Sequence, residues 1–150
     1  MHRYPEQLVI PMRRDLTQYG VEEARTPEEV DAALSADSGS VLMVVNSVCG
    51  CAAGKARPAV GMALQHDVRP KKAVTVFAGA DVEAVAHLRA GKMASIAPSS
   101  PSMAIFRNGE PVFILHRRDI ESREAPQIAK LLIDAFEQHC APQPAATQQS

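Results

Sequence analysis

Two cysteines stand one residue apart in the stretch NSVCGCAAGKARP, with Gly50 between Cys49 and Cys51. Three kinds of chemistry suit such a pair: a redox-active dithiol, half of a metal site, or two thiols buried as small apolar groups. The pair follows the apolar run SVLMVVN and precedes a segment with helical character. This position favours the redox interpretation, because the dipole at a helix N-terminus stabilises a thiolate.

The place of each thiol predicts its role in exchange. Cys49 lies just ahead of the helix, so we expect it to be the more exposed thiol and to attack as a thiolate. Cys51 falls in the first turn and is expected to be the more buried, resolving thiol. Lys55 and Arg57 follow shortly after and are expected to stabilise the thiolate further.

Gly50 is expected to shape the disulfide form. A disulfide joins Cα atoms about 4.4–6.8 Å apart, so a pair with one intervening residue must turn sharply. Glycine permits such a turn, including one with a positive φ. Residual strain should make the bond easy to reduce, which favours accepting thiols or isomerising disulfides over acting as a strong reductant.

A metal site is the weaker interpretation, because zinc takes four ligands that usually come in paired sets. The other candidate ligands are scattered, without a second paired set: His66, His87, His116, His139 and Cys140. We therefore expect neither a bound metal nor a bound cofactor. Cys140 is expected to be a partly exposed bystander, and an intermolecular disulfide is the alternative.

The composition bounds the class of protein. The 150 residues, 46% of them hydrophobic and 22% charged, predict a globular domain with a sizeable core. A formal net charge of −1, no Trp and only 4% aromatic residues argue against a nucleic-acid partner. No apolar run is long enough to span a membrane, and the first residues do not resemble a secretory signal. A cytoplasmic location is the expectation.

The order of predicted elements indicates the fold. Helices are predicted over residues 11–20, 26–35, 52–66, 81–91 and 125–140, buried strands over 40–46 and 73–79, and a β-hairpin over 102–116 around Asn108-Gly109. A cysteine pair between the first core strand and its helix, in this order of elements, predicts an α/β thioredoxin-like fold. We expect a central mixed β-sheet flanked by helices, with extra N-terminal helices. A single domain over 1–140 and a disordered tail over 141–150 are expected.

Ser100 and Pro101 are a second support for this fold. Thioredoxin-like proteins place a cis-proline just before the third core strand, facing the redox pair. Pro101 precedes a predicted strand and is expected to be cis, so that it and its neighbours line the substrate groove. A trans proline that ends a loop is the alternative.

The stretch NSVCGCAAGKARPAV is similar to the signature of the bacilliredoxins, a thioredoxin-like family with a CGC centre. PMRRDLTQYG, SSPSMA and FRNGEPVFILHR also resemble that family, so the resemblance covers about residues 4–139. It implies a cytosolic thiol–disulfide oxidoreductase that removes bacillithiol, a low-molecular-weight thiol, from mixed disulfides on proteins. Members have also been regarded as disulfide isomerases.

Carried onto this chain, the resemblance makes Cys49 the residue that attacks the mixed disulfide and takes up the bacillithiol. Cys51, or another bacillithiol molecule, then releases it, and Pro101 matches the family's proline. Val48 stands where thioredoxin has Trp, which argues against a general reductant. The partners implied are bacillithiolated or disulfide-containing proteins, with bacillithiol as co-substrate.

Two further possibilities stay open from the residues alone. The pair could serve a general disulfide isomerase, or a non-enzymatic redox-sensing or metal-carrying module. The basic pairs Arg13-Arg14 and Arg117-Arg118 are typical of solvated surface. Contact with carboxylates of an anionic thiol is the alternative for them.

Overall fold

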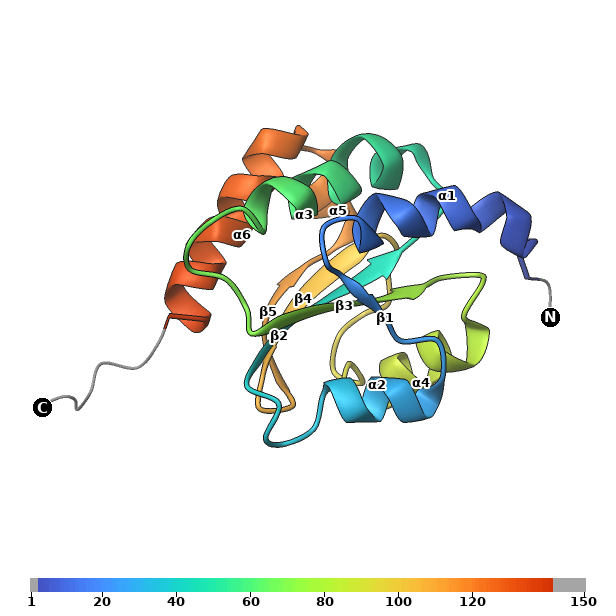
Figure 1. The fold of residues 1–150 in the computed structure, drawn as a ribbon, viewed down its shortest axis with the longest axis horizontal. Helices are drawn as coiled ribbons and strands as arrows, with labels where there is room; N and C mark the ends of the chain where they lie inside the picture. Colours follow the sequence, from blue (N-terminus) through green and yellow to red (C-terminus); the bar gives the residue numbers. More distant parts are fainter. Residues whose placement is uncertain (1–2, 142–150) are drawn as a thin grey trace, which may run out of the picture.

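The structure, a computed structural model, describes residues 3–141, so almost all of the tail predicted over 141–150 lies outside the described residues. A five-stranded mixed sheet in the order β1-β3-β2-β4-β5 forms its centre (Figure 1). The strands are β1 (Glu22–Glu23), β2 (Ser40–Asn46), β3 (Lys72–Phe77), β4 (Ser102–Arg107) and β5 (Glu110–Leu115). Strand β2 pairs parallel with β3 and antiparallel with β4.

Strand β2 lies in the middle of the sheet, as its unbroken apolar sequence predicts. Every residue from Val41 to Asn46 is buried, because helices cover both faces. The β4–β5 hairpin turns at Asn108 and Gly109, which have φ of 51° and 83°. Positive φ at both central residues is the conformation for which Asn-Gly is selected.

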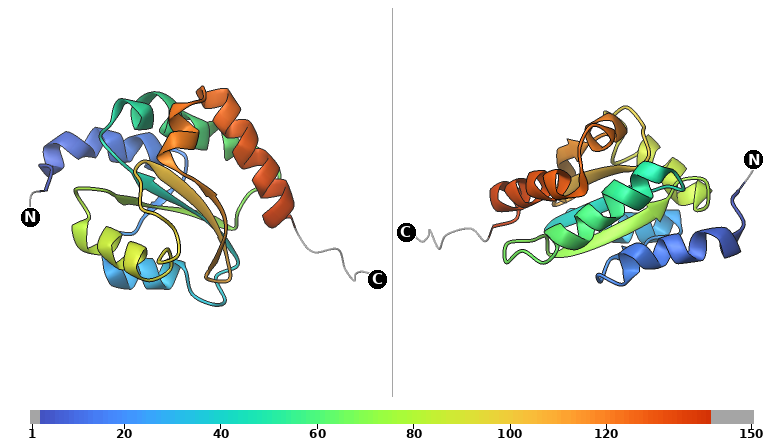
Figure 2. Two further views of the ribbon diagram at one scale, coloured as in Figure 1. Left: turned by 180° about the vertical axis from the view of Figure 1, so that it is seen from behind. Right: turned by 90° about the horizontal axis from the view of Figure 1, so that it is seen from above.

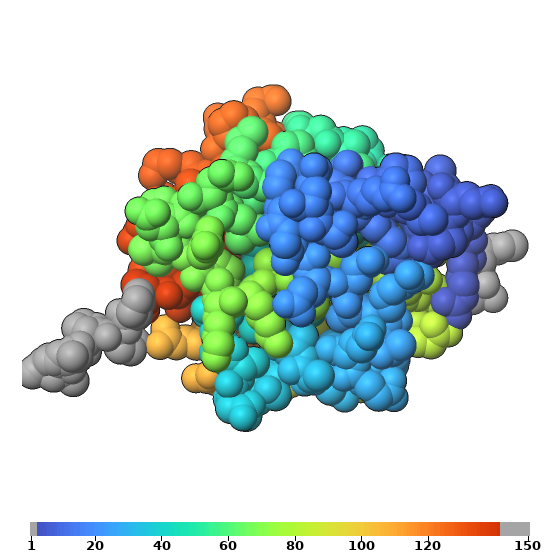
Figure 3. All heavy atoms as spheres, viewed as in Figure 1, coloured from blue at the N-terminus to red at the C-terminus, as the bar shows by residue number. Residues whose placement is uncertain are grey.

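Helices form a layer on each face of the sheet, as the views from behind and above show (Figure 2). The helices are α1 (Glu6–Thr17), α2 (Pro27–Ala33), the π-helical turn η1 (Ala52–Ala56), α3 (Arg57–Ala63), α4 (Val82–Ala90), α5 (Arg117–Glu121) and α6 (Ala125–His139). Helices α3 and α6 pack over one face and α2 and α4 over the other. The space-filling view shows α1 lying beside α3 on the first of these layers (Figure 3). These findings confirm the thioredoxin-like α/β architecture.

Three elements differ from the prediction. Helix α1 begins at Glu6, ahead of the predicted start at Pro11. Pro11 is inside the helix and exposed, so its missing N–H costs one bond without interrupting the buried side. Strand β1 and helix α5 were not predicted, because segments of two and five residues are too short to show a period.

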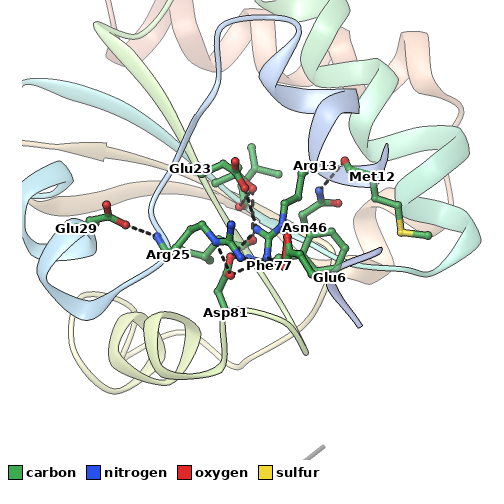
Figure 4. A network of polar contacts seen from close by, with 12 residues as sticks. Glu6, Met12, Arg13, Glu23, Arg25, Glu29, Asn46, Phe77 and Asp81 are labelled. Atoms are coloured by element: carbon green, nitrogen blue, oxygen red, sulfur yellow. Dashed lines mark hydrogen bonds and ion pairs between the residues drawn. The ribbon is translucent and has the colours of Figure 1, made fainter. Parts of the chain in front are cut away.

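An ion-pair network attaches α1 to the sheet (Figure 4). Arg13 is only 5% exposed and donates to both carboxylate oxygens of Asp81, at 3.0 and 2.8 Å. It also donates to Glu23 at 2.9 Å and to Glu6 at 2.9 Å. The prediction of a solvated Arg13 is therefore wrong. The Asp81 side chain makes no capping hydrogen bond to α4, and accepts from Arg13 and from the backbone N–H of Phe77.

Candidate redox site

The cysteine pair lies where β2 leaves the sheet and the next helix begins. Gly50 and Cys51 are already helical, and the Cys49 carbonyl accepts from the N–H groups of Ala52 and Ala53 at 3.1 and 3.2 Å. Cys49 is thus placed directly before a helix N-terminus. This is the predicted location of the pair.

The helix after the pair begins as one wide turn. In η1 the Arg57 N–H donates to the Ala52 carbonyl, a π-type bond, and α3 continues from there. Pro58, which lacks an N–H, follows at the start of α3. The helix predicted over 52–66 is therefore irregular, with a π turn ahead of Pro58. Such turns are frequent at functional sites.

The two thiols are free and their sulfur atoms lie 2.7 Å apart. Burial acts to raise the pKa of Cys49, but hydrogen bonds from the Cys51 thiol, Ser47 and the N–H groups of Ala52 and Cys51 lower it below its ordinary value. Burial, the contact with Cys49 and its charge raise the pKa of Cys51 to about 11. The directions agree with an attacking Cys49 and a resolving Cys51, a division of roles that stays a prediction.

Exposure separates the two thiols less than expected. Both are partly exposed, although Cys51 packs against the core cluster under α3 and α6. In the dithiol form the φ of Gly50 is not positive, and an added Cβ would meet nothing within 4 Å, so the prediction for the disulfide form stays a prediction. With both cysteines as thiols, position 50 therefore does not require glycine.

The predicted cations act elsewhere. Lys55 donates to the Glu121 carbonyl at 2.7 Å, on α5. Arg57 is 3% exposed and donates to Asp15, Asn46 and the Ser47 carbonyl at 3.0, 3.0 and 2.9 Å. Arg57 therefore holds the loop before Cys49 in place through buried hydrogen bonds. The charge of Arg117 acts to lower the pKa of Cys51, and both thiols in turn help to raise the pKa of Arg117.

Ser100 and Pro101 immediately precede β4, and Ser100 lies in the same cleft as Cys49. The Ser100–Pro101 peptide bond is cis, as predicted, and Pro101 is buried. The Ser100 carbonyl accepts from Nη1 of Arg117 at 3.3 Å. Because the start of β4 pairs with the end of β2, this turn lies at the end of the sheet where the cysteine loop begins.

A cleft of about 290 Å³ opens at Cys49. Its lining residues are Tyr4, Ser47, Val48, Cys49, Ala78, Gly79, Ser100 and Arg117. Tyr4 donates from its N–H to the Gly79 carbonyl at 2.9 Å, and a Cβ at Gly79 would stand 2.6 Å from its ring. The sequence did not point to Tyr4 or Gly79, because their contact joins segments far apart in the chain.

The other candidate ligands lie apart from the thiols. Among residues 3–141 no group of three or more His, Cys, Asp or Glu is arranged to hold a metal ion. His66 pairs with Glu137 and His87 with Asp31, at 2.6 and 2.7 Å. Burial raises the pKa of Cys140, which makes it a poorer nucleophile at neutral pH. No helix within the described part of the chain is long and apolar enough to cross a membrane.

Comparison with known proteins places most of the chain in one family. The family model described as "Disulphide isomerase" matches residues 4–140. A bacilliredoxin of Salinibacter ruber is 54% identical over 139 residues, which cover 91% of this chain and 81% of the relative. Bacilliredoxins of Koribacter versatilis and Halalkalibacterium halodurans are 48% and 47% identical, each over 91% of this chain and 94% of the relative.

Solved structures agree on the fold. The structure described as "A putative oxidoreductase with a thioredoxin fold" superposes with a TM-score of 0.58 at 14% identity, covering 75% of this chain and 94% of that one. A mutant thioredoxin from Halobacterium salinarum gives a TM-score of 0.54 at 18% identity, covering 87% and 96%. The match over residues 4–140 and the identity to these relatives show that the chain belongs to the bacilliredoxin family.

Proposed function

We propose that this chain is a thiol–disulfide oxidoreductase that removes bacillithiol from mixed disulfides on proteins. The observation that carries the proposal is the contact between the Cys49 and Cys51 thiols at a helix N-terminus, with their pKa values moved in opposite directions. A thiolate beside a protonated thiol is the arrangement that exchange needs. Membership of the bacilliredoxin family supports this choice of substrate class.

The reaction runs in two exchanges. The Cys49 thiolate attacks the bacillithiol sulfur of the mixed disulfide, and the substrate protein leaves as a thiolate that takes up a proton. Cys51 then loses its proton and attacks the Cys49 sulfur, which releases bacillithiol and leaves a Cys49–Cys51 disulfide. The dithiol has given two electrons and the mixed disulfide has taken them. Two molecules of a low-molecular-weight thiol then restore the dithiol and are themselves joined as a disulfide.

No bound cofactor is needed in this scheme, in which bacillithiol is a co-substrate. The proposed location is the cytosol, where thiols are kept reduced and disulfides are mostly transient and catalytic. Ser100 lines the cleft in which the substrate chain would lie, whereas its neighbour Pro101 is buried and does not line it.

The test uses a protein substrate carrying one bacillithiol mixed disulfide. Cys49→Ser is expected to abolish release of the substrate thiol. Cys51→Ser is expected to trap bacillithiol on Cys49, seen as an intact-mass adduct. Cys140→Ser is the matched control and should behave as the parent chain, because Cys140 lies outside the cleft. Absence of the adduct in Cys51→Ser would refute the assigned roles.

General disulfide isomerisation is a second candidate, favoured by the description of the matching family model. It requires only that Cys49 attack a protein disulfide in place of a mixed disulfide. Recovery of activity from a substrate with scrambled disulfides would measure it. The rate of bacillithiol removal and the rate of disulfide isomerisation, measured in the same preparation, distinguish the two functions. A redox-sensing role would instead give slow exchange with both substrates.

A further inference from the structure

Arg117 is the charged side chain that the structure places in the thiol cleft. It lines that cleft together with Cys49 and Ser100. The other lining residues carry no charge: Tyr4, Ser47, Val48, Ala78, Gly79 and Ser100. The pKa of Arg117 is raised by its hydrogen bond to Glu121 and by the nearby Cys49 and Cys51. Arg117 therefore shares the cleft with the attacking cysteine.

The guanidinium is held on one side and open on the other. Nε donates to Glu121 at 2.9 Å and Nη1 to the Ser100 carbonyl at 3.3 Å. The backbone N–H of Arg117 is fixed by the Ser99 hydroxyl at 3.2 Å. Within residues 3–141, Nη2 makes no hydrogen bond, and the side chain is 45% exposed. Donors thus remain for a ligand in the cleft.

We propose that Arg117 binds a carboxylate of the low-molecular-weight thiol that Cys49 takes up, and so gives the chain a preference for anionic thiols. This inference rests on the proposed exchange function and names a specificity residue for it. A guanidinium suits this task because its planar donors match a carboxylate.

The charge balance of the reaction supports this assignment. When the Cys49 thiolate forms a bond to the incoming sulfur, the old S–S bond breaks and the electron pair leaves on the substrate protein. The negative charge of Cys49 is then lost beside Arg117. A carboxylate on the captured thiol replaces it, whereas a neutral thiol leaves the guanidinium with Glu121 alone. The adduct with an anionic thiol is the better compensated of the two.

The test compares three small thiols of similar length and different charge. A peptide with one cysteine is prepared as its mixed disulfide with 3-mercaptopropionate, 2-mercaptoethanol or cysteamine. The rate of adduct formation on Cys49 is followed by mass spectrometry in the full chain carrying Cys51→Ser. The anionic thiol should transfer fastest and the cationic thiol slowest.

Arg117→Gln should lower the anionic-to-neutral rate ratio about five-fold, as expected for losing one partly exposed ion pair. Arg117→Lys keeps the charge without the planar donors and should fall between. Arg118→Gln removes the same charge from the next residue, which does not line the Cys49 cleft, and should leave the ratio unchanged. The ratio is the decisive readout, because a change in the Cys49 pKa or in folding acts on all three thiols alike.

Each contrary result has a distinct meaning. Equal slowing of all three thiols by Arg117→Gln would refute carboxylate binding by Arg117, but it would not contradict the proposed thiol exchange. An equal fall in the anionic-to-neutral rate ratio for Arg117→Gln and Arg118→Gln would also refute carboxylate binding. The preference would then come from the general positive charge of this surface and not from a contact with Arg117. If no thiol formed an adduct on Cys49, the proposed function itself would be refuted, and carboxylate binding by Arg117 with it.

Discussion

The guanidinium of Arg57 donates a hydrogen bond to the Ser47 backbone carbonyl, 2.9 Å away, and so ties the start of α3 to the loop that carries Cys49. The same buried group donates to the Asn46 side chain, at the end of β2, and to Asp15 on α1. One side chain thus joins three elements behind the thiols. The position of Cys49 depends on it, although Arg57 lies outside the cleft.

Arg57→Met is therefore expected to lower the free energy of unfolding by about 2–4 kcal/mol, because it leaves buried acceptors without a donor. Exchange at Cys49 should also slow, since the loop loses its tie. Lys55→Met is the matched control. Its single bond, to the Glu121 carbonyl, is exposed, so its cost should stay below about 0.5 kcal/mol. Denaturant unfolding checks both values, and equal losses would contradict the argument.

The pKa of Cys49 should be lower than that of an ordinary cysteine, whereas the pKa of Cys51 should be about 11. Thiolate absorbance in a Cys140→Ser chain measures both. Exchange should consequently rise with pH and level off at a lower pH than for free cysteine. Cys51→Ala removes the S–H donor, so the pKa of Cys49 should rise, while Cys51→Ser retains a hydroxyl donor and should raise it less. An ordinary Cys49 pKa in the parent chain would favour a redox sensor over an enzyme.

Arg13 and Arg14 are neighbours with opposite surroundings. Arg13 is buried in the network with Asp81, whereas Arg14 is exposed. Arg13→Met should lower the free energy of unfolding by about 3 kcal/mol, because the buried Asp81 loses its two-point partner and keeps only Arg25, 3.4 Å away, as a counter-charge. Arg14→Met should change it by less than about 0.5 kcal/mol. Thermal and urea unfolding of the two variants provide the test, and similar losses would show that the network contributes little.

The parts of the fold that could be predicted are those with a local signal. Strand β2 is an unbroken apolar run, and α6 repeats its apolar residues at helical spacing. The turn at Asn108-Gly109 needs a backbone conformation that these two residues favour. The cysteine pair could be placed because both of its flanking elements were recognisable.

The remaining parts depend on contacts between distant segments. Arg13 looks like surface charge until Asp81 is brought to it from the far end of β3. Arg117 lies in a helix of five residues, too short for a periodic pattern. Lys55 and Arg57 are near the thiols in sequence, but the helix directs them to α5 and to the end of β2. Spacing along the chain therefore identified the thiols and not the cation beside them.

The dithiol and disulfide forms need different backbone conformations at Gly50. With free thiols it lies in a helical turn without positive φ, and an added Cβ meets no neighbour. Gly50→Ala should therefore stabilise the dithiol form by about 1 kcal/mol, the usual gain of alanine over glycine in a helix. The disulfide form requires a sharper turn and should not share this gain.

The redox equilibrium should then move toward the dithiol. For a two-electron couple, a stabilisation of about 1 kcal/mol raises the reduction potential by about 20 mV. Equilibration of parent and variant with the same glutathione buffers, read by intact mass after thiol alkylation, measures the difference. Gly54→Ala, at an exposed position in η1 where an added Cβ also meets no neighbour, serves as the control. It should stabilise both redox states alike and leave the potential unchanged. A potential that Gly50→Ala does not move would mean that the disulfide form keeps the same helical turn.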